Sequence, residues 1–240
     1  SDVRPSRIAY NRLNGSFSNI KPEEVDWNKA LENCNFFHWT GITPGISESA
    51  YETLKQGLQF AYSKGIHITT DPAYRSNLWN YGKKGQDILK ELIGYSTIFI
   101  GGVNEINEIL ETNFSTDKNG FIEASKTLMK EIPSIQKVFD KVRIGINASS
   151  QATQGRAWIN NEYLETEEIQ INHVVDRIGT GDAFAAGLIY GLINHDDQFA
   201  LNFANAACAM KHTILGDTNL ASVDDILELV NGNFGGRIKR

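Results

Sequence analysis

Short apolar runs and longer amphipathic stretches alternate along most of the chain. Residues 35–40 (NFFHWT), 66–70 and 97–100 have the length and composition of buried strands. Between these runs, apolar residues recur at the three- and four-residue spacing of a helix, as over residues 47–64 and 85–93. This alternation predicts an α/β fold with a mostly parallel sheet covered by helices.

The remaining elements follow from the same reading. Strands are predicted at 8–11, 35–40, 66–70 and 97–100, with a hairpin of strands at 156–159 and 163–171. Helices are predicted at 22–32, 47–64, 85–93, 105–110, 120–131, 183–193, 198–213 and 223–230, with a turn at 41–45. Residues 137–143 (KVFDKVR) make a poor apolar strand. No internal repeat or linker interrupts the pattern, so residues 1–240 are expected to form one domain.

The segment before residue 183 carries candidate chemistry. Gly179, Thr180 and Gly181 precede Asp182, and the predicted helix that follows (AFAAGLIYGLI) is too apolar for the surface. Glycine allows the backbone to approach a ligand, and the free N–H groups of a helix N-terminus favour an anion. A carboxylate at this position suits phosphoryl transfer, in which it accepts the proton of the attacking hydroxyl. The alternative is that Asp182 only caps the helix.

Longer segments resemble known kinases. Residues 174–184 (VVDRIGTGDAF) resemble the C-terminal signature of the ribokinase-like (PfkB) sugar kinases. Four further segments are similar to 2-keto-3-deoxygluconate kinases: 4–12 (RPSRIAYNR), 71–79 (DPAYRSNLW, with alanine at 73 where asparagine is usual), 143–149 (RIGINAS) and 211–217 (KHTILGD). The resemblance implies a ribokinase-like three-layer α/β/α sandwich with a mostly parallel sheet and a small β lid, to which residues 1–20 contribute.

The resemblance also implies an activity. The expected reaction is ATP-dependent phosphorylation of the primary hydroxyl of 2-keto-3-deoxygluconate to 2-keto-3-deoxy-6-phosphogluconate. The alternatives are another ribokinase-like kinase, of fructokinase or ribokinase type, and an inactive fragment or binding module of the same fold. No counterpart of the family's first strand and glycine-rich substrate loop precedes Ser1. We therefore expect the N-terminal part of the family to be absent from this sequence, either through a true truncation or because the sequence is part of a longer protein.

The substrate residues implied by the resemblance include two arginines. Arg12 and Arg75 would hold the carboxylate of the sugar acid, because a guanidinium binds a carboxylate through two parallel hydrogen bonds. Tyr10 would hydrogen-bond the substrate through its hydroxyl. Asp182 would be the general base, and Gly179, Thr180 and Gly181 would hold the developing charge. The alternatives are surface ion pairs for the arginines and a core-facing strand position for Tyr10.

On the nucleotide side, the resemblance places Arg143, Gly145 and Ser149 in the loop beside the phosphates of ATP, together with the amides of Gly179 and Gly181. Asn205 would form part of the adenine wall. Its alternative role is a helix residue that bonds a neighbouring loop.

Magnesium is expected because ATP phosphates require a divalent cation to offset their charge. The superfamily's N-x-x-E motif has Asn107 at the position of its acid here, so Asn104, Glu105 and Glu108 are the candidates for the metal site. Asp176, at the end of a strand predicted over residues 171–175, is either structural or a ligand of K⁺.

Composition adds limits on partners and location. The hydrophobic content of 41% and charged content of 22% are those of a globular protein, and the net charge of −6 argues against nucleic acid as the main partner. The two cysteines, Cys34 and Cys208, form no metal-like pair and are expected to be reduced thiols in a cytoplasmic protein. No apolar run reaches the length of a membrane span. A homo-oligomer, either a dimer or a dimer of dimers, is expected through the strand at 8–11, because an exposed lid edge requires a partner.

Overall fold

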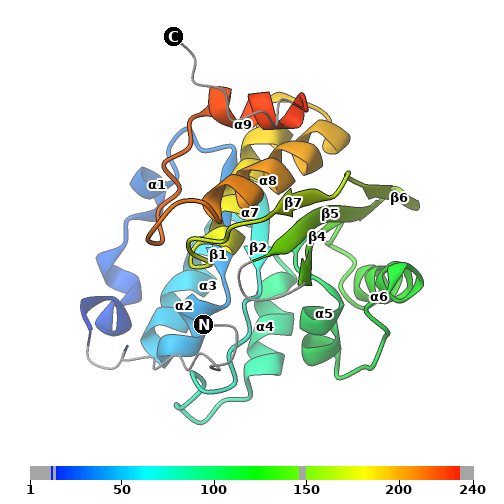
Figure 1. The fold of residues 1–240 in the computed structure, drawn as a ribbon. Helices are drawn as coiled ribbons and strands as arrows, with labels where there is room; N and C mark the ends of the chain where they lie inside the picture. The colour runs from blue at the N-terminus through cyan, green and yellow to red at the C-terminus, as the bar shows by residue number, and fades with distance from the viewer. Residues whose placement is uncertain (1–11, 13–14, 146–149, 233–240) are drawn as a thin grey trace. The chain divides into compact units, whose positions relative to one another are not determined.

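A computed structural model describes residues 12, 15–145 and 150–232 (Figure 1). The chain divides into two compact units. The first, here the N-terminal unit, comprises residues 6–139 and 158–162, and the second, here the C-terminal unit, comprises residues 1–5, 140–157 and 163–240. Strand β4 (Lys137–Gly145) crosses from the first unit into the second.

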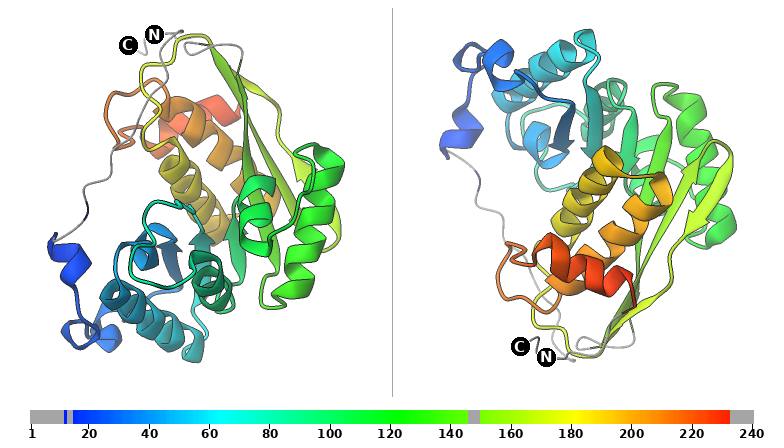
Figure 2. Two further views of the ribbon diagram at one scale, coloured as in Figure 1. Left: turned by 90° about the horizontal axis from the view of Figure 1, so that it is seen from below. Right: turned by 90° about the horizontal axis from the view of Figure 1, so that it is seen from above.

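The N-terminal unit is built on parallel strands. β1 (Phe36–Thr40), β2 (His67–Asp71), β3 (Ile98–Ile100) and the first residues of β4 follow one another in the sheet, each parallel to the next. The helices between them are α2 (Ile42–Ile46), α3 (Glu48–Ser63), α4 (Gly85–Ile93), α5 (Val103–Leu110) and α6 (Lys118–Glu131). Helices α3 to α6 lie side by side in chain order (Figures 1 and 2). Their apolar stripes and the strands enclose the fully buried core residues Leu58, Ile68, Leu89, Phe99, Ile106 and Phe121.

Local signals in the sequence define the ends of these helices. The Ser47 hydroxyl accepts a hydrogen bond from the Ala50 amide at 3.1 Å and caps α3. Gly65, at a φ of +69°, follows its last turn. Asp117 caps α6 in the same way through the Gly120 amide at 2.8 Å. These caps explain why helix boundaries were predicted closely here.

In its described residues, the C-terminal unit combines strands at one side of the same sheet with helices. β4 neighbours β5 (Gln151–Ile159), β5 neighbours β6 (Glu162–Glu165), and β7 (Ile169–Ile171) pairs antiparallel with β5. The turn between β5 and β6 consists of two asparagines, Asn160 and Asn161, with φ of +51° and +63°, which is the backbone that a two-residue hairpin requires. The helices of this unit are α7 (Thr180–Asn194), α8 (Asp197–Lys211) and α9 (Val223–Val230).

Helices α7 and α8 approach each other closely (Figure 2). A Cβ on Gly191 would overlap the backbone of Ala200, and one on Gly187 would lie 3.1 Å from the Ala204 Cα. The small residues of α7 therefore allow its backbone to pack directly against α8. This packing accounts for the uniformly apolar sequence of the helix that follows Asp182.

Most predicted elements are confirmed, and the helices at 85–93 and 223–230 match to the residue. Four predictions were wrong. The predicted helix at 22–32 is a 3₁₀ turn (Pro22–Glu24) followed by a short helix α1 (Trp27–Ala30), and the predicted turn at 41–45 is helix α2. The predicted strand at 163–171 is divided into β6 and β7. The strand predicted at 171–175 already ends at Ile171. Strand β5 of the predicted hairpin is also hydrogen-bonded to β4 and so belongs to the main sheet. The strand at 8–11, on which the expected oligomer rests, lies outside the described residues. None of the helices within the described ranges is long and apolar enough to cross a bilayer.

The poor apolar pattern of residues 137–143 conceals a regular strand. Val138 and Phe139 are fully buried, and Asp140 follows them into the interior. Arg156 on β5 donates to one oxygen of the Asp140 carboxylate through Nε and Nη2, both at 2.8 Å. The two side chains are only 8% and 10% exposed. This ion pair explains how β4 can carry a carboxylate at a buried position.

We expect Asp140→Asn to destabilise the protein by about 3–5 kcal/mol, because it removes the negative charge that is paired with the buried Arg156 guanidinium. The free energy of unfolding in urea measures this loss. The double variant Asp140→Leu/Arg156→Leu should lose less than the sum of the two single leucine variants, since it removes both charges. Glu123→Gln, on the exposed side of α6, is the control. A cost for Asp140→Asn no larger than that of the control would show that the pair does not stabilise the strand.

Candidate active site

Two loops of the C-terminal unit meet at the beginning of α7. Gly179 is the N-cap residue and has a left-handed backbone, with φ of +78°. A Cβ at this position would overlap the carbonyl oxygen of Asp217. Residue 179 must therefore be glycine for two reasons: its left-handed backbone angle and the close approach of the loop that contains Asp217.

Asp182 stands in the first turn of α7, as predicted, and its side chain is exposed. Its alternative role as the helix cap is wrong, because the N-cap is Gly179 and no side chain caps this helix. Within the described part of the chain, no hydrogen bond or salt bridge engages the Asp182 carboxylate. The amides of Gly181 and Asp182 precede the first intrahelical bond, which runs from Ala183 to Gly179 at 2.9 Å. A carboxylate with free lone pairs thus lies beside backbone N–H groups that can bind an anion.

Thr180 is nearly buried, and its hydroxyl donates to the carbonyl oxygen of Arg177 at 3.0 Å. The same hydroxyl oxygen accepts a hydrogen bond from Nζ of Lys141 at 3.4 Å. Lys141 lies on β4, and its ammonium is also 3.8 Å from the position that a Cβ on Gly181 would occupy. The sequence pattern gave no role to this lysine, although it lies in direct contact with the predicted anion site.

Asp176 closes the loop that leads into α7. Its Oδ1 accepts from the Ile178 amide at 3.0 Å, and its Oδ2 accepts from the Gly216 amide at 2.9 Å. These two backbone amides hold the pKa of Asp176 below its usual value. Both oxygens therefore serve the structure, which agrees with the structural one of its two predicted roles.

A buried cation lies close to this carboxylate. Lys211 is fully buried at the end of α8, and its Nζ donates to the Ile214 carbonyl at 2.9 Å. The charge of Lys211 adds to the lowering of the Asp176 pKa. The protein itself therefore supplies a positive charge close to the loop that contains Asp176.

Three further cations act on one buried histidine. His212 is almost completely buried, and its Nδ1 donates to the Cys208 carbonyl at 2.8 Å. Burial lowers the His212 pKa, and the charges of Lys141, Arg143 and Arg177 lower it further. The hydrogen bond to Cys208 opposes this shift without reversing it. Three positively charged side chains thus lie close enough to act on His212, and positive charge near the start of α7 suits the binding of phosphate groups.

The structure supports the other predicted nucleotide-binding residues to different degrees. Gly145, at the exposed end of β4, has open space around the position of a Cβ, and Ser149 lies outside the described residues. Asn205 is fully buried, and its Nδ2 lies within hydrogen-bonding distance of Thr153 O, Thr166 Oγ1 and Glu167 O. The structure thus favours its alternative role as a residue that bonds a neighbouring loop, because its amide is enclosed by protein.

In the N-terminal unit, Arg75 follows β2 and is exposed. Its Nη1 donates to the Tyr74 carbonyl at 2.8 Å, and no salt bridge engages it within the described residues. Ala73 nearby has a φ of +35°, a backbone that asparagine tolerates better than alanine, which gives a physical reason for the family's usual residue at this position. Arg12 is exposed, and Tyr10 lies outside the described residues.

The candidate metal residues lie on α5, after β3. Glu105 accepts from the Gly102 amide at 3.0 Å and so completes the capping of this helix, while Asn104 and Glu108 are exposed. Partial burial and the charge of Glu105 raise the pKa of Glu108. Asn107, at the position of the family's acid, is committed to the loop after the helix, since it bonds the backbone of Phe114 in both directions. In the described ranges no three histidine, cysteine or acidic side chains gather as a metal cluster. A magnesium ion held largely by ATP phosphates requires only one or two carboxylates, and Glu108 fits that need.

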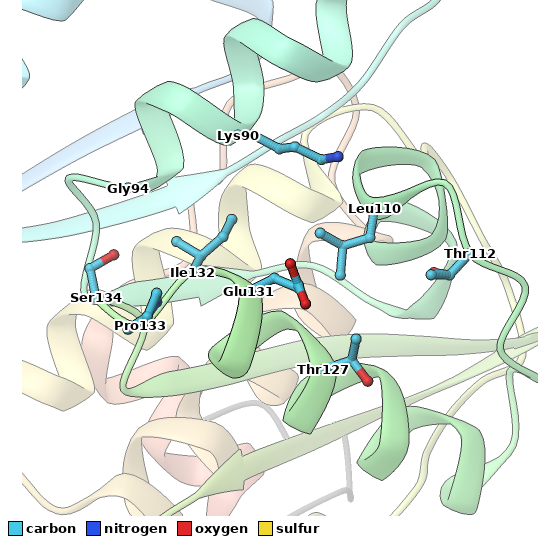
Figure 3. A pocket seen from close by; sticks show the side chains of 9 residues that line it. All are labelled: Lys90, Gly94, Leu110, Thr112, Thr127, Glu131, Ile132, Pro133 and Ser134. Atoms are coloured by element: carbon cyan, nitrogen blue, oxygen red, sulfur yellow. The ribbon is translucent and has the colours of Figure 1, made fainter.

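A cavity of about 480 Å³ lies elsewhere in the N-terminal unit (Figure 3). Its lining includes Lys90 from α4, Leu110 from α5 and Glu131 from α6. Gly94 precedes β3 and Ser134 precedes β4, so the cavity lies at the amino ends of these strands. Arg75 and the first residues of α5 follow the carboxyl ends of strands, where α/β proteins bind ligands. The cavity is therefore a different place from the predicted substrate and metal residues of this unit.

An α/β protein in which a glycine-rich helix start carries free amides, nearby cations and an unpaired carboxylate has the parts of a phosphotransferase. Comparison with known proteins agrees with this class. The model of the pfkB family of carbohydrate kinases matches residues 6–222, and the chain belongs to this family. The predicted ribokinase-like α/β fold is thereby confirmed.

Two similar proteins are named for related sugar acids. A 2-dehydro-3-deoxygalactonokinase from Haloferax volcanii is 26% identical over 237 residues, which cover 97% of this chain and 68% of that protein. A crystal structure of a 2-dehydro-3-deoxygluconokinase from Thermotoga maritima is 29% identical, with a TM-score of 0.89, and the match covers 97% of this chain and 71% of that one. The chain therefore spans about two thirds of the length of these relatives.

A third solved structure, a fructokinase from Xylella fastidiosa with bound ATP, shares the fold at 17% identity, with a TM-score of 0.70. The match covers 89% of this chain and 66% of that one. ATP is thus a ligand of a protein with this fold.

We expect Gly179→Ala to abolish most nucleotide binding, because the added Cβ displaces the Asp217 loop and with it the first turn of α7. The left-handed backbone alone costs about 1–2 kcal/mol for alanine. Gly216→Ala is the matched control, since Gly216 has a φ of +86° but nothing within 4 Å of a Cβ. Calorimetric titration with ATP and the melting temperature of each variant measure the two effects. Equal ATP affinity in the two variants would contradict the role of the close approach.

Proposed function

We propose that this chain is an ATP-dependent kinase that phosphorylates the primary hydroxyl of 2-keto-3-deoxygluconate. The observation that carries the proposal is the exposed carboxylate of Asp182, which has no partner among the described residues and lies beside free amides at the start of α7. Membership of a family of carbohydrate kinases supports phosphoryl transfer to a sugar. The names of the two similar proteins support a 2-keto-3-deoxy sugar acid as the acceptor.

In the proposed reaction Asp182 is the general base. Its carboxylate accepts the proton of the sugar hydroxyl while the hydroxyl oxygen forms a bond to the γ-phosphorus of ATP, and the bond to the ADP oxygen breaks. The amides of Gly179 and Gly181, with the support of Thr180, hold the charge on the transferred group. Arg143 binds the phosphate chain at the end of β4, close to Gly145. A bound Mg²⁺ would offset the charge of the phosphates, and Glu108, with Asn104 and Glu105 close by in sequence, would order its waters.

The sugar acid differs from a neutral hexose in its carboxylate. Arg75 and Arg12 are the proposed partners of that group, because a guanidinium can form two parallel hydrogen bonds to it. The exposed Arg75 side chain has no salt-bridge partner in the described part of the chain, which leaves its remaining donors for a ligand. The gluconate and galactonate epimers both carry this carboxylate, so both belong in a substrate screen, with fructose and ribose as neutral competitors. Turnover of fructose or ribose above that of both acids would favour the alternative activities.

The role proposed for Asp176 is structural. Its two oxygens bind backbone amides, and the buried Lys211 supplies a positive charge nearby. We accordingly expect equal activity in potassium and in a bulky organic cation at the same ionic strength. A clear requirement for potassium would restore the alternative role of Asp176 as a ligand of K⁺.

Asp182→Asn should lower kcat by about 10²–10⁴-fold, the usual loss on removal of a general base. The amide keeps the size of the side chain, so ATP affinity and the melting temperature should stay near those of the wild type. Asp224→Asn is the control, because Asp224 is an exposed acid in the first turn of α9. Turnover of Asp182→Asn at a rate close to that of the control would exclude Asp182 as the base.

Arg75→Ala should raise KM for the sugar acid by roughly one to two orders of magnitude, the worth of a charge-assisted hydrogen bond, with little change in KM for ATP. Arg75→Lys should restore only part of the affinity, because an ammonium lacks the fork of donors. Steady-state kinetics with each substrate varied in turn distinguish these effects. An unchanged KM for the sugar acid would remove Arg75 from the substrate site.

A further inference from the structure

Lys141 occupies an electrostatically unfavourable position. Its Nζ lies 3.4 Å from the Thr180 hydroxyl oxygen, against the first turn of α7. A helix N-terminus carries a partial positive charge, so a cation placed there is destabilised. Arg143 and Arg177 add further positive charge, since both act with Lys141 on the same buried histidine. The position becomes favourable only when an anion enters.

Lys141 forms no salt bridge with a carboxylate among the described residues. The neighbouring Asp140 is paired with Arg156 and turns into the interior. The Thr180 hydroxyl directs its own hydrogen to the Arg177 carbonyl, so it serves Lys141 only as an acceptor. Of the three donors of an ammonium group, this contact uses one.

Strand geometry adds a second cation on the same side. Residues two apart on a strand point to the same face, so Lys141 and Arg143 share one face of β4. Lys141 is half-buried beside Thr180, whereas Arg143 is exposed, nearer the end of the strand. The two side chains thus form a row that leads from the surface to the start of α7. A chain of linked phosphates is the ligand that such a row fits.

We propose that Lys141 binds the terminal phosphoryl group of ATP and positions it against the first turn of α7, while Arg143 binds the phosphates behind it. The proposal rests on the proposed function, because it assigns the anion of this site to a nucleoside triphosphate. Lys141 then offsets the charge of the transferred group together with the amides of Gly179 and Gly181. The ammonium is a positioning group and takes no part in proton transfer.

The test compares ATP with ADP, because only ATP carries the terminal phosphoryl group. Calorimetric titration of Lys141→Met with each nucleotide, in the presence of magnesium and without any sugar, measures binding alone. ATP affinity should fall by roughly 10- to 100-fold, the worth of a charge-assisted hydrogen bond, and ADP affinity should fall much less. Lys141→Arg should recover part of the ATP affinity, because it restores the charge.

Lys130→Met is the matched control, since Lys130 is exposed on α6 and should leave both affinities unchanged. Lys141→Gln repeats the test with a polar side chain if the methionine variant does not fold. Equal losses for ATP and ADP in the folded variant, or no loss for either, would overturn the proposal. A wild-type protein that binds ATP no better than ADP would overturn it as well.

The acceptor is absent from this measurement, so the result is separate from the proposed function. If Lys141→Met loses ATP selectively but the wild type phosphorylates neither epimer, the substrate assignment fails and the role of Lys141 stands. If the wild type phosphorylates the sugar acid but Lys141→Met keeps its preference for ATP, the role of Lys141 fails and the proposed function stands.

Discussion

The candidate active site depends on the approach of two loops at one glycine. The carbonyl of Asp217 occupies the space that a side chain at Gly179 would need, and the left-handed backbone of Gly179 turns the chain into α7. The carboxylate of Asp176 joins the same two loops, because it accepts one amide from each. The direction of α7, and therefore the direction of its free amides, follows from this closure. A loop joined at both of its ends can hold an anion site in place before any ligand arrives.

Packing behind the site keeps the helix in that direction. Gly187 and Gly191 allow the backbone of α7 to lie directly against α8, because larger side chains at these two positions would overlap that helix. Val175 and Asp176 also donate their amides to the His212 carbonyl at the end of α8. The helix and the loop before it are thus attached to the same neighbour.

In the C-terminal unit, three charged side chains near the start of α7 are opposite in sign to the net charge of the whole chain. The protein carries a net charge of −6, but burial lowers the pKa of His212, and the charges of Lys141, Arg143 and Arg177 lower it further. The lowered pKa favours the neutral form of the buried His212, so this side chain adds little to the positive charge nearby. A protein with a negative net charge can therefore bind a polyanion at a local cluster of positive charges, because nearby charges outweigh distant, screened ones.

The sequence by itself determined the features that depend on neighbours in the chain. Alternating strands and helices, the cap residues Ser47 and Asp117, and the glycines before Asp182 are local signals, and the structure reproduces them. The short helix after Gly41 was missed, and the strand over residues 137–143 was undervalued. In the strand, the stabilising partner, Arg156, lies on another strand.

Only the tertiary structure decided which groups surround the start of α7. Lys141 meets Thr180 across 39 positions of the sequence, and Asp176 meets Gly216 across 40. Asn205, which the family pattern assigned to the nucleotide, is enclosed by β5 and the segment after β6. The periodicity of the sequence cannot predict such contacts, because they form only when separate elements pack against each other. The motif indicated the chemistry of the site, and the packing selected the residues that carry its charge.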